Sequence, residues 1–214
     1  MTTSTEQEIQ KIMALRNSLQ RMMASLLASI GDVQIGTHGQ FPYGWRKAAK
    51  GRTVWRLLEE LISQNIEARH RELGMQTFTP ADSEVGVYDF MFTLPDDVAV
   101  YVNVKSAVRG GRTNKDDISK ARSLEQFFSA DPARILLVAT VEIEFLTPMA
   151  IRLLGCSVVP VMWLPDIYVN PSNNGNLQSS QYKNLAAAQH RTGAQFLTLL
   201  REAIATADEK RRSR

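Results

Sequence analysis

Three polar side chains in the middle of the sequence could together bind a hard cation and a phosphate group. Asn103 and Lys105 stand two residues apart in the apolar run YVNVKSA, and Asp89 interrupts the earlier apolar run GVYDFMF. Residues two apart on a strand point to the same face. Carboxylate and amide oxygens suit Mg²⁺, which usually takes few protein carboxylates. We therefore expect Mg²⁺ to bind Asp89 and Asn103, with the carbonyl of Val104 as a further ligand.

Lys105 adds a positive charge to this group. Beside a bound cation, it could orient a water molecule or balance the charge that develops when a phosphodiester is attacked. Each charge also has a purely structural explanation: Lys105 could protect an exposed edge strand from aggregation, and Asp89 could be a solvated residue at a strand end. Charged residues inside otherwise apolar strands need a reason, which favours a site.

A β-hairpin is expected to bring these side chains together. The two apolar runs flank Pro95-Asp96-Asp97, and proline in the second place of a tight turn with aspartate around it is typical of a hairpin. The two strands would then be antiparallel neighbours. Asp89 and Lys105 could project from the same face of their sheet.

The rest of the sequence predicts helices and strands in alternation. Helical periodicity predicts a long amphipathic helix over 6–30 and a second helix over 46–73. After the hairpin we expect a helix over 114–128, a strand over 133–145, a short helix over 147–155 that ends at Gly155, a strand over 156–163, a polar loop over 170–181 and a helix over 183–207. This order predicts an α/β fold, a mixed β-sheet flanked by helices.

Length and composition predict an ordinary globular chain. Its 214 residues are 44% hydrophobic and 22% charged, which suits a single domain over 1–214. Within it we expect an N-terminal helix and loop over 1–45, a catalytic core over 46–165, and a polar recognition loop with a C-terminal helix over 166–214. No apolar stretch suits a membrane span, and the polar N-terminus has no signal-peptide pattern, so a cytoplasmic location and no membrane partner are expected.

Several other kinds of site are excluded by the sequence. The one cysteine, Cys156, cannot build a disulfide framework or a thiolate metal cage within one chain. His38, His70 and His190 do not have zinc-site spacing. Neither a phosphate-loop motif nor a G-x-S-x-G motif occurs. The grouping of Asp89 and Lys105 is what remains.

This grouping resembles the PD-(D/E)xK nuclease superfamily, and specifically small type II restriction endonucleases. An acidic helix, an aspartate near the start of a hairpin, and an x-x-K on its second strand followed by a basic loop carry the resemblance, over roughly 51–163. It implies a restriction-endonuclease-like core and a Mg²⁺-dependent DNA phosphodiesterase. By this resemblance Asp89 binds the metal, Lys105 is the motif lysine, and Glu59 completes the site, with Glu60 as the fallback.

Two positions qualify the resemblance. Asn103 stands where the superfamily has Asp or Glu, which removes one negative charge and should weaken metal affinity. Glu59 lies at the margin of an apolar helical stripe, where a solvated glutamate is also expected.

Basic and amide side chains outside the hairpin are the expected DNA contacts. Cationic side chains near the site would meet phosphates; these are Arg52, Arg109, Arg112 and Lys115. Amide side chains present donors and acceptors to base edges; in the polar loop these are Asn173, Asn174, Asn176 and Gln178. A flexible surface turn and an ordinary polar loop explain the same segments without a function.

The sequence therefore predicts a site-specific endonuclease of double-stranded DNA, a type II restriction enzyme of a restriction-modification system. A homodimer would match a palindromic DNA site, and the N-terminal helix has apolar residues, including Met22 and Met23, for such a contact. Packing within its own chain explains that stripe equally well. The alternatives are a non-catalytic nucleic-acid-binding protein whose nuclease-like core lost its site through Asn103, and a structure-selective DNA repair nuclease.

Overall fold

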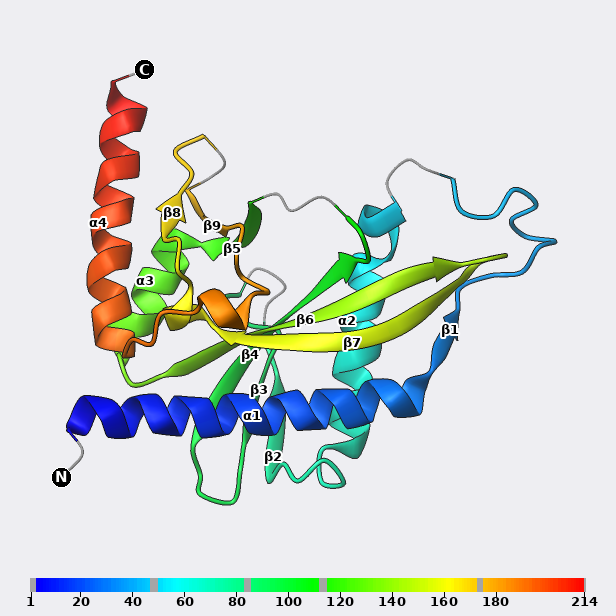
Figure 1. Ribbon diagram of the computed structural model, residues 1–214, viewed down its shortest axis with the longest axis horizontal. Helices are drawn as coiled ribbons and strands as arrows, with labels where there is room; N and C mark the ends of the chain where they lie inside the picture. The colour runs from blue at the N-terminus through cyan, green and yellow to red at the C-terminus, as the bar shows by residue number, and fades with distance from the viewer. Residues whose placement is uncertain (1–2, 47–49, 83–85, 112–114, 173–174, 214) are drawn as a thin grey trace.

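A curled, mixed β-sheet forms the centre of the structure (Figure 1). The computed structural model describes residues 3–46, 50–82, 86–111, 115–172 and 175–213. Across the six-stranded sheet the strands are β1 Asp32–Gln34, β7 Ala150–Pro160, β6 Ile135–Leu146, β4 Ala99–Val108, β3 Phe90–Thr93 and β2 Thr77–Pro80. Strands β4 and β6 are parallel and the other neighbours are antiparallel.

Helices and a second, smaller sheet flank this centre. The small sheet has the order β5 Asp116–Lys120, β9 Asn176–Ser179 and β8 Tyr168–Val169. The helices are α1 Ser4–Ile30, α2 Lys50–Arg69, α3 Ala121–Ala130 and α4 Gly193–Arg212, with 3-10 turns η1 Val161–Trp163 and η2 Leu185–Ala187. Helix α1 packs along β7, α2 packs on β4, and α3 and α4 pack on each other beside the small sheet. The predicted α/β fold with a long N-terminal helix is confirmed.

Helix α1 is defined at both ends by its sequence. Thr3 and Glu6 form a capping box, in which each side chain accepts a hydrogen bond from the other residue's backbone N–H. Gly31 ends the helix at φ 69°, a conformation that favours glycine. The apolar stripe packs into the chain's own core, where Met23 is 1% exposed and Met22 lies at the margin. The predicted homodimer stays a prediction.

Two side chains of α1 complete the outer edge of β7. Strand β1 pairs with β7 only at residues 150–152. Further along, Gln20 donates from Nε2 to the Cys156 carbonyl (2.6 Å) and accepts at Oε1 from the Val158 N–H (3.1 Å). Arg16 donates from Nε to the Val158 carbonyl (2.8 Å). Side chains of a helix thus satisfy backbone groups that a neighbouring strand would otherwise satisfy.

The predicted short helix over 147–155 is wrong. Residues 150–160 form β7, which reverses direction after β6 and pairs with it along its length. Gly155, predicted to stop a helix, instead lies beside an irregularity in the register, opposite Glu142 while Leu153 pairs with Ile143. Glycine often marks such a bulge in a strand. Pairing with β6 is what overrides the local helical pattern.

The predicted helix over 114–128 and the polar loop over 170–181 are each partly wrong. The first begins as β5, and its helix starts only at Ala121. The second contains β9, whose pairing with β5 joins segments about sixty residues apart. In place of one predicted helix over 183–207, the structure has the short turn η2 and then helix α4, which starts at Gly193. Long-range pairing that a local pattern does not contain decides each of these segments.

The described residues contain no helix that is both long enough and apolar enough to cross a membrane. A single apolar core joins the two sheets and the helices, with contributions from α1, α2, α3 and α4. This core fixes α2 over β4, which is the packing that positions the candidate site.

We expect Gln20→Ala to lower the free energy of unfolding by about 1–3 kcal/mol, because it leaves the Val158 N–H and the Cys156 carbonyl without their partner. Urea denaturation would measure the change. Gln10→Ala is the matched control: Gln10 is an exposed glutamine of the same helix, and its replacement should stay within about 0.5 kcal/mol of the parent chain. Equal effects of the two substitutions would contradict this role for Gln20.

Candidate active site

The site begins where β3 stops pairing with β4. The predicted hairpin is present, and its register pairs Phe90 with Val102. The Asp89 N–H donates to the Val102 carbonyl (2.8 Å), and beyond this point β6 is the one strand paired with β4 in the part of the chain that the structure describes. The Val104 N–H then donates to Oδ2 of Asp89 (2.6 Å). The Asp89 carboxylate thus accepts the hydrogen bond that the backbone of a longer β3 would have accepted.

Asn103 and Lys105 lie on one face of β4, as predicted. Val100, Val102 and Val104 are buried on the opposite face, while the residues between them are half-buried. The Asn103 side chain donates from Nδ2 to the Val87 carbonyl (3.2 Å). An ionised aspartate at position 103 has no proton for this bond, so the amide has a structural role in this chain.

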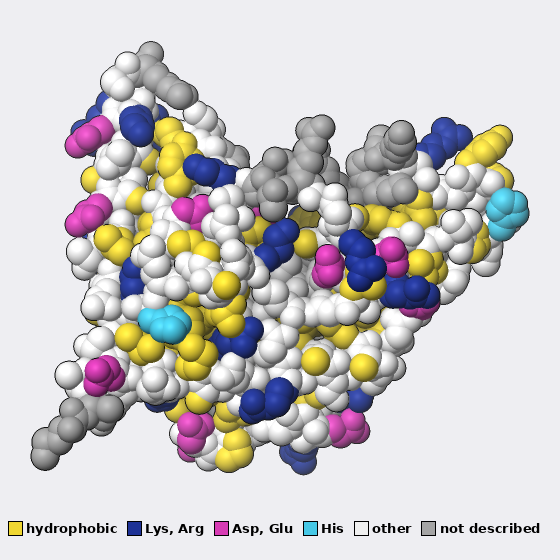
Figure 2. Space-filling view, viewed as in Figure 1, with side chains coloured by type: hydrophobic (Ala, Val, Ile, Leu, Met, Phe, Trp, Pro, Cys, Tyr) yellow, Lys and Arg dark blue, Asp and Glu magenta, His cyan; other side chains and the backbone are white. Residues whose placement is uncertain are grey.

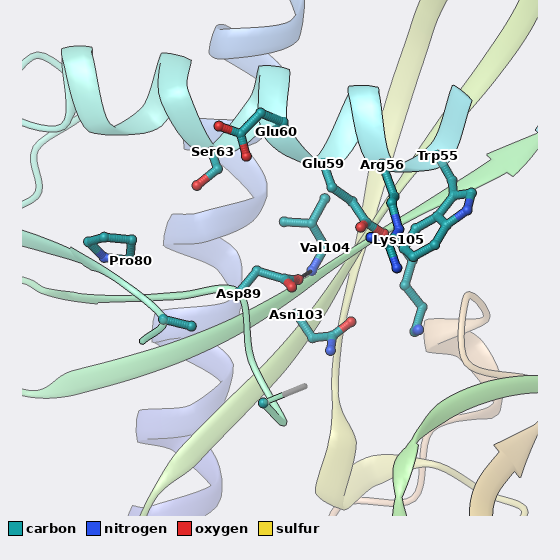
Figure 3. Close-up of a pocket in the computed structure, with 12 residues that line it drawn as sticks. Trp55, Arg56, Glu59, Glu60, Ser63, Pro80, Asp89, Asn103, Val104 and Lys105 are labelled. Carbon is teal, nitrogen blue, oxygen red and sulfur yellow. Dashed lines mark hydrogen bonds between the residues drawn. The ribbon is translucent and has the colours of Figure 1, made fainter. Parts of the chain in front are cut away.

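Helix α2 brings Glu59 to the same place. Leu58 and Ile62 are fully buried, which leaves Glu59 half-buried at the margin of the apolar stripe. These segments enclose a pocket of about 370 Å³, shown in Figure 3. Its lining residues are Trp55, Arg56, Glu59, Glu60, Ser63, Pro80, Ala81, Gly86, Asp89, Asn103, Val104 and Lys105. All four predicted catalytic residues line it, as do Val104 and the fallback Glu60.

Ionisation of both carboxylates of the pocket, Glu59 and Asp89, is unfavourable. Burial, and then the nearby charge of Asp89, raise the pKa of Glu59 to about 7, against the opposing effect of Lys105 and Arg56. Burial also raises the pKa of Asp89, although the Val104 N–H and Lys105 partly offset this. Desolvation and like charge both disfavour ionised carboxylates. A cation bound in the pocket would instead favour the ionised forms of both carboxylates.

Lys105 lies between two groups of carboxylates. Burial lowers its pKa, while the charges of Glu59, Asp89, Asp116 and Asp117 raise it. The first two belong to the pocket, and the last two belong to β5. Sequence reasoning missed the β5 pair because it placed 116 and 117 on a helix. The Lys105 ammonium is therefore near enough to both the pocket and the small sheet to feel their charges.

The donor atoms in the pocket suit a hard cation. Glu59 and Asp89 supply carboxylate oxygens, and Asn103 and the Val104 backbone supply neutral ones, a set poor in carboxylates as Mg²⁺ usually has. Within the described residues, no group of three or more His, Cys, Asp or Glu side chains is placed to bind a metal ion. Glu59 and Asp89 line the same pocket, and a positive charge bound beside them would stabilise their ionised forms.

The predicted DNA contacts are not all in one place. Arg109 is exposed at the end of β4, with its guanidinium 3.9 Å from the Glu144 carboxylate. Lys115 lies with its ammonium 4.0 Å from the centre of the Tyr168 ring. Asn176 and Gln178 lie on β9 and donate hydrogen bonds to Asp117. Arg112, Asn173 and Asn174, and the side chain of Arg52, lie outside the described residues.

Trp55 is a pocket residue that sequence reasoning missed. It is 38% exposed at the rim, and the Arg56 guanidinium lies over its ring, 4.9 Å from the centre. Arg56 belongs to a run of basic residues over 46–56 in the sequence, which was an available signal for it. Nothing in the periodicity distinguished Trp55 from a core residue. On the side of the molecule seen in Figure 1, Figure 2 shows Lys and Arg side chains over α4 and along the β6–β7 hairpin.

The raised pKa of Glu59 predicts a pH dependence of stability in metal-free buffer. Between its usual value of 4.5 and about 7, the unfolded chain has released this proton while the folded chain keeps it. The folded state then binds more protons, so the free energy of unfolding falls as pH rises through this window. Urea denaturation at several pH values measures the slope. We expect Glu59→Gln to flatten it, and an unchanged slope would contradict the assignment.

Comparisons with known proteins give similarity at the level of structure only. No protein-family model matches the chain, and no curated protein sequence matches it. Among solved structures, the chain is similar to NlaIV restriction endonuclease, with 13% sequence identity, 76% of each chain covered and a TM-score of 0.44. At this identity and TM-score the similarity assigns no activity and no residue role to this chain.

Proposed function

We propose that this chain is a Mg²⁺-dependent endonuclease that hydrolyses phosphodiester bonds of double-stranded DNA at specific sites, as a type II restriction enzyme does. The observation that carries the proposal is the convergence of Glu59, Asp89, Asn103 and Lys105 on one pocket. Glu59 comes from α2, and Asp89 directly precedes β3. Asn103 and Lys105 come from β4. The sequence resemblance to the PD-(D/E)xK superfamily names the same four positions.

Three side chains would bind the cation, with the Val104 carbonyl as a further ligand. Asp89 and Glu59 supply the negative charge, and Asn103 supplies a neutral oxygen beside them. When bound, Mg²⁺ would polarise the phosphate and stabilise the charge that develops on it. Asp89 is already oriented by the Val104 N–H, so its side chain loses little conformational entropy when it binds the cation. Glu59 is placed by the burial of its neighbours on α2.

Lys105 is assigned to the attacking water and the phosphate. Its side chain lies on the same face of β4 as Asn103, and its ammonium is influenced by both pocket carboxylates. As a donor, it would orient the water for attack on phosphorus and offset the negative charge that accumulates there. The phosphorus–oxygen bond to the sugar breaks as the bond to the water oxygen forms. Arg56 at the pocket rim, with Arg109 and Lys115 beyond it, would contact neighbouring phosphates.

We expect Lys105→Ala and Asp89→Ala each to reduce cleavage at least about 100-fold, as loss of a charge-stabilising group usually does. Circular dichroism and DNA binding in Ca²⁺ would show that the variants remain folded. Lys11→Ala, which removes an exposed lysine of α1 outside the pocket, is the control and should cleave normally. A folded Lys105→Ala protein that cleaves like the parent chain would refute the role of Lys105.

Digestion of plasmid DNA in Mg²⁺ distinguishes the alternatives. Discrete fragments support a restriction enzyme, and EDTA should abolish them until Mg²⁺ is added back. Cutting only at unusual DNA structures would indicate a repair nuclease. DNA binding without cleavage under all conditions would indicate a non-catalytic protein, and the proposed function would then be wrong.

Replacement of Asn103 tests whether the pocket binds a cation. We expect Asn103→Asp to lower the Tm of the metal-free protein, because it adds a third carboxylate and removes the hydrogen bond to Val87. Mg²⁺ should then raise the Tm more than it does in the parent chain, since tighter binding to the folded state stabilises it more. Asn184→Asp, at an exposed position outside the pocket, is the control. A Mg²⁺ effect no larger than in the parent chain would contradict a cation site at Asn103.

A further inference from the structure

The small sheet has one buried and one outward face. Leu177 and Ser179 of β9 are fully buried, and Ile118 of β5 is buried beside them. Asp117 and Tyr168 both pair with Gln178 in the register. Asn176 lies two residues before Gln178 and therefore shares its face. The outward face thus carries a row of an acid, two amides and an aromatic ring.

Asp117 fixes both amides of this face. It accepts from Asn176 Nδ2 at one carboxylate oxygen (3.0 Å) and from Gln178 Nε2 at the other (2.6 Å). Gln178 is held from its second end, because its Oε1 accepts from Asn170 Nδ2 (3.2 Å). Bonds of this kind determine which end of each amide carries the oxygen and hold the group in one orientation. The array is set before any ligand binds.

Asn176 differs from Gln178 in the hydrogen-bonding groups that remain for a ligand. Its Nδ2 has a second proton, and among the described residues no group donates a hydrogen bond to its Oδ1. A donor and an acceptor on one planar amide match the N6 amino group and the N7 atom of adenine, which lie side by side in the major groove. Asp117 has both oxygens occupied by the amides, so it acts through them.

The array lies next to the candidate active site. Asp116 and Asp117 are close enough to Lys105 to influence it electrostatically, as Glu59 is from the side of α2. Figure 1 shows the small sheet and α2 on opposite sides of the C-terminal half of β4. Lys115, whose ammonium packs on Tyr168, adds a positive charge on this side. A duplex with one phosphodiester in the pocket would therefore pass the small sheet.

We propose that Asn176, oriented by Asp117, reads an adenine in the major groove of DNA whose phosphodiester lies in the pocket. The proposal rests on the proposed function and gives it a specificity determinant. Asn176 is the residue that contacts the base, and Asp117 is a positioning residue. Gln178 and Asn170 complete the array that keeps Asp117 in place.

Selection from a random-sequence duplex library, bound in Ca²⁺, tests the proposal. The parent chain should enrich sequences with adenine at a fixed position. Asn176→Ala should reduce the preference for adenine there by about 5- to 150-fold, the usual discrimination of a bidentate base contact. Asp117→Ala should relax the same position although Asn176 is intact. A merely structural role would weaken binding to all sequences and leave the preference unchanged.

Two further variants make the outcome clear. Asn176→Gln keeps an amide but displaces it, and it should also lose the adenine preference in a chain that folds normally. Asn184→Ala is the matched control, because Asn184 is an exposed asparagine that bonds to Gln181 and lies outside the array; it should keep the preference.

The result can separate this proposal from the proposed function. A parent chain that enriches no adenine, or an Asn176→Ala or Asp117→Ala chain that keeps the parent preference, would overturn the adenine contact. If the parent chain also cuts plasmid DNA in Mg²⁺, the proposed function stands without it. Selective binding that depends on Asn176 in a chain that never cleaves would support the contact and overturn the endonuclease.

Discussion

The hydrogen bond from the Val104 N–H to Asp89 is the interaction on which the site depends. Had β3 continued past Phe90, its backbone would have paired with β4 and closed the edge at which the pocket opens. Because the strand stops and a carboxylate accepts the N–H instead, β4 keeps a satisfied backbone and an accessible edge. One bond thus serves the sheet and orients a site residue.

In the absence of a ligand, burial of the ionisable groups in the pocket is unfavourable for the stability of the folded chain. Partial burial raises the pKa of both Glu59 and Asp89 and lowers that of Lys105. Such shifts gather at functional sites, although structural networks of charges produce them too. The apolar core beneath, where α2 packs on β4, compensates by fixing the elements that carry these groups. Stability and the candidate site therefore come from opposite faces of the same segments.

The hairpin and its polar residues were predictable because they break a local pattern. Asp89 and Lys105 are charges in apolar runs of the sequence, and a tight turn between the two runs is encoded next to them. Strand β9 was not predictable: its pairing with β5 is supported by Gln178 and Asn176 bonding to Asp117, and neither segment has an apolar repeat. Strand β7 has a pattern compatible with both helix and strand, and only its neighbour β6 decides between them. Local sequence specifies the site better than the sheet around it.

The contacts of Arg16 and Gln20 with β7 also affect how this chain can associate with others. An open strand edge is a template for a strand of another molecule. Along residues 156–158 that edge is occupied by side chains of α1. A second copy cannot extend the central sheet there without displacing the helix, so any symmetric assembly has to form through side-chain surfaces at this side of the molecule. Helix α1, which covers the core, therefore also prevents edge-to-edge association of two central sheets along this part of β7.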